Sequence, residues 1–232
     1  SRRLTTAEGQ EARPHFSPDG NSLAFSANYD GNIDVYLVPV SGGAPKRLTW
    51  HGADDLVEGF DARGRVAFSS QRNVYSRREI HLYTVEPGGS FPVQLPIPLG
   101  NDSDVSADNR KIAYSVMPPG MYRAMQQWKD YRGGSVSRVA IMDLDNHSVQ
   151  KVPQPAQRSN DLNPMWIGDK LYFNSDRNGE FNLYSFDPAA AAIQQLTFHK
   201  DYPVVNASAG DGKIIYEQGA HLRLFDPANN TD

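Results

Sequence analysis

The chain of 232 residues contains no cysteine, which excludes a disulfide framework, a thiolate zinc site and a cysteine nucleophile. It has no apolar run near the roughly 18 residues that a membrane-spanning helix needs. It also lacks an excess of positive charge, since its net charge is −4 and its pI is near 5.8. A general nucleic-acid binder would usually be basic. The sequence therefore predicts a protein that works on neither membranes nor nucleic acid.

Two further absences bear on the compartment. No charged-then-apolar signal segment opens the chain, whose abrupt start at Ser1-Arg2-Arg3-Leu4 leaves room for upstream sequence. A chain without cysteine suits a reducing or an oxidising environment equally. The localisation therefore stays open between a cytoplasmic and a periplasmic soluble protein.

Motifs of catalysis are missing as well. The chain has no Gly-x-Ser-x-Gly elbow, no His-Glu-x-x-His and no phosphate-binding glycine loop. Its six histidines form no ligand spacing. His51 and His199 fall at the same place after two similar strands, so we expect them to serve the structure. We expect no metal, no cofactor and no catalytic residue in this segment.

What the chain does have is a repeat. Between residues 170 and 198, three short runs rich in aromatic and aliphatic residues alternate with turn residues, a pattern typical of antiparallel strands. Each repeat closes on a Leu-Thr strand or a variant of it. The marker residues of these strands are Leu4, Leu48, Leu95, Val152 and Leu196, which lie 44, 47, 57 and 44 residues apart. Such a period is typical of the four-stranded blades of a propeller.

Each marker is followed by a polar loop, a first strand and a tight turn such as Ser17-Pro18-Asp19-Gly20. Two apolar strands come next, as expected for strands that pack on both faces. The second strands are 23–26, 66–69, 112–115, 171–174 and 214–217, and the third strands are 34–38, 79–83, 138–142, 182–186 and 221–225.

These repeats predict an all-β fold, a single β-propeller domain over residues 1–232 with five four-stranded repeats. Their approximate bounds are 7–49, 50–96, 97–153, 154–197 and 198–232, with residues 1–6 as a closing strand. If the closing strand pairs with the last repeat, the propeller has five blades and no exposed edge. Otherwise the chain is most of a six-bladed propeller. The strand count does not decide between them.

Two loops carry the most distinctive side chains. The third repeat has an insertion over residues 117–137, and loops of this length are usually functional or disordered. It contains Trp128, Tyr131 and Arg132, which would line a channel mouth or pack against another domain or subunit. The equivalent loop of the second repeat contains Arg72, Arg77 and Arg78. The arginines would form a positive patch for peptide carboxylates or a rim of ion pairs.

The sequence resembles a known family. Its Ser-Pro-Asp-Gly turn, the loop Ser175-Asp176-Arg177-Asn178-Gly179 and the Leu-Thr strand are similar to the TolB-type propeller repeat. Residues 127–134 and 159–166 resemble segments of the amino-terminal six-bladed propeller of tricorn-type serine proteases. The resemblance covers essentially the whole chain, although five repeats are visible where that propeller has six blades.

The resemblance implies a function. Tricorn proteases are self-compartmentalising peptidases whose catalytic domains follow two propellers, and the propellers are thought to gate substrates and products. An adjacent pair of arginines from the first propeller is thought to hold the terminal carboxylate of the substrate. Arg77 and Arg78 occupy a similar loop and are our candidates for that pair. The implied partners are peptide substrates, the protease and second propeller domains of a parent chain, and further copies of that parent.

A second interpretation is a stand-alone scaffold that recruits a protein partner, as the TolB propeller does. A propeller enzyme with its own active site is disfavoured, because no nucleophile with an adjacent base is apparent. Sequence beyond Asp232 would separate the first two interpretations.

Overall fold

The computed structural model describes residues 3–76, 79–116 and 129–232. Within these residues the regular elements are strands, and they form antiparallel sheets in which each strand pairs with the next along the chain. The chain divides into two compact units, Ser1–Asn101 and Asp102–Asp232. The all-β prediction is confirmed, while the single domain over residues 1–232 stays a prediction.

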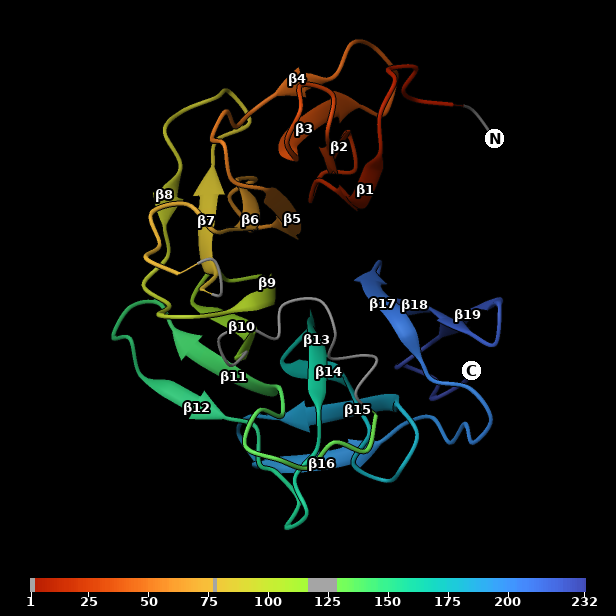
Figure 1. Ribbon diagram of the computed structural model, residues 1–232. Coiled ribbons are helices and arrows are strands. Elements are labelled where there is room, and N and C mark those ends of the chain that lie inside the picture. The colour runs from red at the N-terminus through yellow and green to blue at the C-terminus, as the bar shows by residue number, and fades with distance from the viewer. Residues whose placement is uncertain (1–2, 77–78, 117–128) are drawn as a thin grey trace. The chain divides into compact units, whose positions relative to one another are not determined.

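The first unit holds two four-stranded sheets (Figure 1). The strands of the first sheet are β1 (Glu11–Phe16), β2 (Ser22–Ala27), β3 (Asp34–Pro39) and β4 (Lys46–Arg47). Those of the second are β5 (Asp55–Phe60), β6 (Val66–Ser70), β7 (His81–Val85) and β8 (Val93–Gln94).

The second unit holds the other three sheets. The third sheet contains β9 (Asn101–Val105), β10 (Lys111–Val116), β11 (Arg138–Asp143) and β12 (Val149–Lys151). The fourth contains β13 (Asp161–Ile167), β14 (Lys170–Ser175), β15 (Asn182–Asp187) and β16 (Ala192–Gln195). The fifth contains β17 (Val205–Gly210), β18 (Lys213–Gln218) and β19 (His221–Phe225).

The sheets match the five predicted repeats one by one. The last sheet has three strands among the described residues, and residues 3–6, where we expected a closing strand, carry none. The choice between five and six blades therefore stays a prediction. No helix among the described residues is long and apolar enough to span a bilayer.

The structure explains the Leu-Thr marker. Leu48 is fully buried, and the hydroxyl of Thr49 accepts a hydrogen bond from the amide of Val35 at 3.0 Å while donating to the Asp34 carboxylate at 3.1 Å. In the fourth repeat, Thr197 makes the same two contacts with Leu183 and Asn182. The marker threonine thus accepts a hydrogen bond from a buried backbone amide near the start of the third strand. Buried amides of this kind need such a partner.

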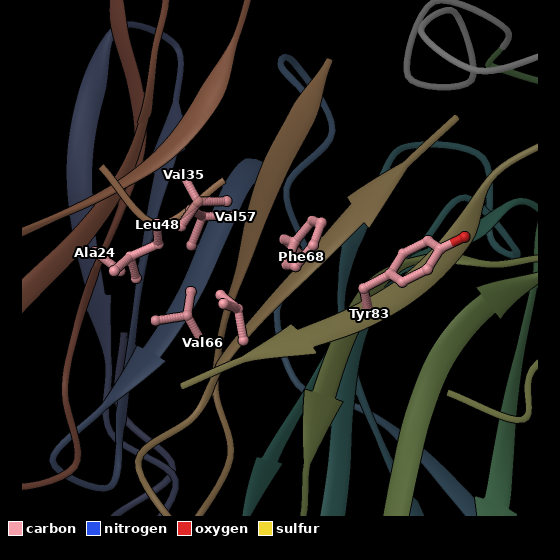
Figure 2. Close-up of a cluster of buried hydrophobic side chains, with 8 residues drawn as sticks. Ala24, Val35, Leu48, Val57, Val66, Phe68 and Tyr83 are labelled. Carbon is pink, nitrogen blue, oxygen red and sulfur yellow. The ribbon is translucent and has the colours of Figure 1, made fainter. Parts of the chain in front are cut away.

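The core lies between successive sheets of each unit. In the first unit, Ala24 and Val35 of the first sheet pack against Val57, Val66 and Phe68 of the second (Figure 2). In the second unit, one cluster joins the third and fourth sheets and another joins the fourth and fifth. In the first four repeats the second and third strands are buried on both faces, as their near-continuous apolar sequence predicts. The prediction is wrong for the fifth repeat, where β18 is exposed on one face and β19 is exposed along most of its length.

A bulge recurs in the first strand of the repeats. The pairing register shifts within β1, β5, β13 and β17. Four residues at the equivalent position have a positive φ between 43° and 52°, namely Arg13, Asp102, Asn163 and Asn206. Asn and Asp tolerate this left-handed conformation better than other residues with a side chain. Such bulges bend a strand and increase its twist.

Candidate functional site

The predicted site residues divide between described and undescribed parts of the chain. Arg77, Arg78 and Trp128 lie outside the described residues. Tyr131 and Arg132 are described and half-buried. Described residues flank Arg77 and Arg78 on both sides, and a described segment carries Tyr131 and Arg132.

The loop that precedes Arg77 begins at a buried arginine. Arg72 is only 7% exposed, and its guanidinium forms an ion pair with Asp55 at the start of β5. The guanidinium also lies over the rings of Phe68 and Tyr83, 5.0 and 5.2 Å from their centroids. We call Asp55, Ser70 and Arg72 the second-repeat anchor. Of the two interpretations of this loop's arginines, Arg72 therefore fits the ion pair and not an exposed positive patch.

The fourth repeat contains the same arrangement, which we call the fourth-repeat anchor. Arg177 pairs with the fully buried Asp161 at 2.9 Å and lies over the rings of Phe173 and Tyr184. Asp161 also accepts hydrogen bonds from the hydroxyls of Ser159 and Ser175 and from the side chain of Gln154. Both of its carboxylate oxygens therefore have hydrogen-bond donors. Burial raises the pKa of both anchor carboxyls, and the paired guanidinium opposes the rise.

The third repeat departs from this arrangement. Gly100 stands where the other two repeats have Asp55 and Asp161, and Val116 stands where they have a serine. The insertion that follows directly after Val116 is thus found in a repeat without an anchor, although the first and fifth repeats also lack the Ser-x-Arg of the anchor.

Arg132 holds the end of that insertion against the fourth repeat. Its guanidinium donates to the carboxylate of the fully buried Asp176 at 2.7 Å and to the Asp176 carbonyl at 3.0 Å. The Lys129 ammonium pairs with Glu180 at 2.8 Å, which raises the pKa of Lys129. We call these contacts of residues 129–132 the clasp. They support packing of Tyr131 and Arg132 within the second unit.

Asn160 completes the clasp. Its amide N–H and its side-chain NH₂ both donate to the Asp176 carboxylate, at 2.7 and 3.0 Å. The backbone amide of Asp130 donates to the same carboxylate at 3.1 Å. The Asp176 carboxylate therefore accepts hydrogen bonds from the insertion and from Asn160, the residue that precedes β13.

We expect Arg132→Ala to loosen the clasp. The change removes a charged donor from a buried carboxylate, which costs about 1–3 kcal/mol. Hydrogen exchange of the Asp130 amide should then become about tenfold faster or more, since this amide is protected by Asp176. Arg138→Ala, at an exposed position of β11, is the control and should leave that rate unchanged. An unaltered rate in Arg132→Ala would contradict the assignment.

Sequence reasoning missed the acidic members of these sites. Asp55 and Asp161 open the first strands of their repeats, and each is matched by an arginine two residues after a second-strand serine. This recurrence of Asp with Ser-x-Arg was visible in the sequence. Among the described residues, no group of three or more His, Asp or Glu is placed to hold a metal ion.

The fold defines a class of protein built from repeats of antiparallel strands, and in the second and fourth repeats a buried ion pair secures the loop after the second strand. Comparison with known families gives the particular one. Residues 1–231 match the tricorn protease N-terminal β-propeller domain, and the chain belongs to that family. The predicted propeller class and the predicted family are both confirmed.

Curated relatives agree with this assignment. A putative tricorn protease homolog 2 of Streptomyces coelicolor is 29% identical over 97% of this chain and 19% of its own length. The tricorn protease of Thermoplasma acidophilum is 24% identical over 98% of this chain and 21% of its own length. The chain thus spans about a fifth of these relatives.

Solved structures show the same fold. The crystal structure of the tricorn protease superposes with a TM-score of 0.82 at 22% identity, over 99% of this chain and 23% of the other. A putative TolB from Agrobacterium tumefaciens gives a TM-score of 0.74 at 17% identity, over 97% of this chain and 80% of the other.

Proposed function

We propose that this chain is a non-catalytic propeller module that gates or positions peptide substrates for a tricorn-like, self-compartmentalising serine protease. The observation that carries the proposal is the family match over residues 1–231, together with relatives that are named tricorn proteases. The partners of the module would be the protease and second propeller domains of its parent chain. Further copies of the parent would complete a homo-oligomer.

Arg77 and Arg78 are proposed to bind the carboxylate at the end of the peptide. Guanidinium groups suit this task because they can donate two parallel hydrogen bonds to one carboxylate. The assignment follows from the resemblance to the family. Arg72, the other arginine of this loop, is committed to the buried Asp55.

A second candidate function is a stand-alone scaffold that recruits a protein partner. It is favoured by the TolB structure, of which this chain covers 80%. Such a scaffold would bind a folded partner and would not distinguish free from amidated peptide ends.

Calorimetry on the full protein that carries this chain tests the proposal. Short peptides with a free carboxyl terminus should bind more tightly than their amidated forms. The variant Arg77→Ala/Arg78→Ala should reduce that preference roughly 10- to 100-fold, because each hydrogen bond to a charged group contributes about 1.5–3 kcal/mol.

Arg63→Ala is a suitable control, since Arg63 is an exposed arginine in the turn between β5 and β6. It should leave the preference intact. Equal binding of the free and amidated peptides by the unaltered protein would refute the carboxylate site and favour the scaffold.

A further inference from the structure

Two exposed aromatic residues follow the Leu-Thr markers of the first and fourth repeats. Trp50 lies between β4 and β5 and is 64% exposed, and Phe198 lies between β16 and β17 and is 69% exposed. In both places a further sheet of the same unit comes next along the chain, and yet the ring stays in water. We call Trp50 and Phe198 the marker aromatics.

The backbone before each marker aromatic is held by the residue that precedes the marker leucine. The Arg47 guanidinium donates to the carbonyl of Thr49 at 2.8 Å, and the side-chain amide of Gln195 donates to the carbonyl of Thr197 at 2.8 Å. The two threonine hydroxyls are themselves bound to the third strands of their repeats. The peptide unit that leads into each aromatic residue is therefore fixed.

The backbone after each marker aromatic is held as well. The side-chain NH₂ of Asn32 donates to the His51 carbonyl at 2.8 Å, and that of Asn182 donates to the His199 carbonyl at 3.0 Å. With the backbone held on both sides, the freedom that remains is mainly that of the aromatic side chain itself. Such a position presents a side chain without the entropy cost of ordering a loop on binding.

Trp50 is held further through its ring. The Arg47 guanidinium lies 5.9 Å from the centroid of the ring, and it pairs with the buried Asp34 at 2.6 Å. A guanidinium over the face of an indole is attracted to it electrostatically. The ring therefore has a preferred position, although most of it is in water.

The markers of the second and third repeats show that the fold does not require an aromatic residue here. Pro96 and Pro153 replace the marker threonine in these repeats. The next residue is Ile97, which is buried, or Gln154, which donates to the carboxylate of Asp161. Ile97 and Gln154 thus contribute to the interior of their own units, whereas the marker aromatics point to a contact outside them.

We propose that the marker aromatics are anchor residues that dock into apolar pockets of another folded domain of the same parent chain. This inference rests on the proposed function, which makes the parent a protease of several domains. Aromatic side chains, Trp above all, carry much of the binding energy of protein interfaces, and they fill desolvated pockets on the partner. A folded domain has such pockets in place, whereas a short flexible peptide does not.

The length of the relatives supports a partner in the same chain. This chain spans about a fifth of the curated tricorn proteases that it matches. Covalent connection gives the other domains of such a protein a high effective concentration, so a few anchor residues are enough to hold them. Trp50 and Phe198 lie in different units, and each would dock independently of the other.

Hydroxyl-radical footprinting of the full protein, read by mass spectrometry, tests this docking. Phe91, between β7 and β8, is the control, because it is 94% exposed and follows no marker. After correction for the reactivity of each residue type, oxidation of Trp50 and Phe198 should be at least about fivefold lower than that of Phe91, since anchor residues in an interface are shielded from water. Oxidation of either marker aromatic in proportion to its exposure in this structure would refute its role as an anchor.

Two further outcomes would overturn docking within the chain. Protection that disappears on dilution would show that the marker aromatics bind a further copy of the parent, because contacts within one chain do not depend on concentration. Protection that appears only after a tripeptide is added would show that they bind the substrate.

The footprint also separates this inference from the proposed function. If the marker aromatics are protected while free and amidated peptides bind equally, the docking stands and the carboxylate site fails. If they are oxidised like Phe91 while the free acid is preferred, the docking fails and the carboxylate site stands.

Discussion

Replacing Asp161 with alanine should lower the free energy of unfolding by about 3–5 kcal/mol. The side chain of Asp161 is fully buried and that of Arg177 is 10% exposed, so the guanidinium would keep its charge without a partner. The hydroxyls of Ser159 and Ser175 would lose their acceptor at the same time. Urea denaturation followed by tryptophan fluorescence measures the change, since Trp166 lies on the same strand, β13.

An exposed ion pair of the same unit is the control. Arg110 and Asp145 lie 3.2 Å apart, but their side chains are 64% and 66% exposed. Asp145→Ala should cost no more than about 1 kcal/mol, because water screens such pairs. The double variant Asp161→Leu/Arg177→Met should recover much of the loss, since it removes the stranded charge. Similar effects of Asp161→Ala and Asp145→Ala would contradict the buried anchor.

The second large effect concerns pH. Asp104 on β9 accepts hydrogen bonds from the backbone amides of Val105 at 3.0 Å and Trp166 at 2.7 Å, and so joins the third and fourth repeats. Burial nevertheless raises the pKa of its carboxyl to about 7, and the two amide donors oppose the rise. Between about pH 4 and 7, Asp104 is therefore protonated in the folded state and ionised in the unfolded state, where its pKa is near 3.9.

The direction of the effect follows from this difference. Stability from protonated Asp104 is fully present below about pH 4 and is lost as the pH rises through about 7. Three units of pKa correspond to a loss of about 4 kcal/mol at most. We expect Asp104→Asn to remove this dependence of the unfolding free energy on pH. The stability of the variant relative to the unaltered protein should therefore rise between pH 4 and 7.

The measurement is the difference in unfolding free energy between the two proteins at a series of pH values. Taking the difference cancels other groups, including His15, whose pKa burial lowers to about 4. A difference that is constant with pH would show that Asp104 is ionised throughout.

The sequence predicted the repeats because their signals are local. A strand, a turn and a closing Leu-Thr are each read from a few neighbouring residues, and in the first four repeats burial of the second and third strands follows from their apolar character. The role of Thr49, by contrast, depends on Asp34 and Val35, which reach it only after the third strand has formed.

The site was harder to predict, because its contacts join distant residues. Arg132 and Asp176 are 44 positions apart and meet only because successive sheets pack together. Arg72 looks in the sequence like an exposed loop arginine, and only Asp55 at the start of another strand explains its burial. The bulge residue Arg13 gave no signal either, since arginine is not typical of a left-handed backbone.

The missing anchor of the third repeat has a practical consequence for protein engineering. Where Asp55 or Asp161 secures an arginine at the end of the second strand, new sequence placed after that strand would have to break a buried ion pair. Gly100 and Val116 impose no such penalty. Foreign recognition loops should therefore be grafted after Val116, while the corresponding positions of the second and fourth repeats should be left intact as rigid scaffold.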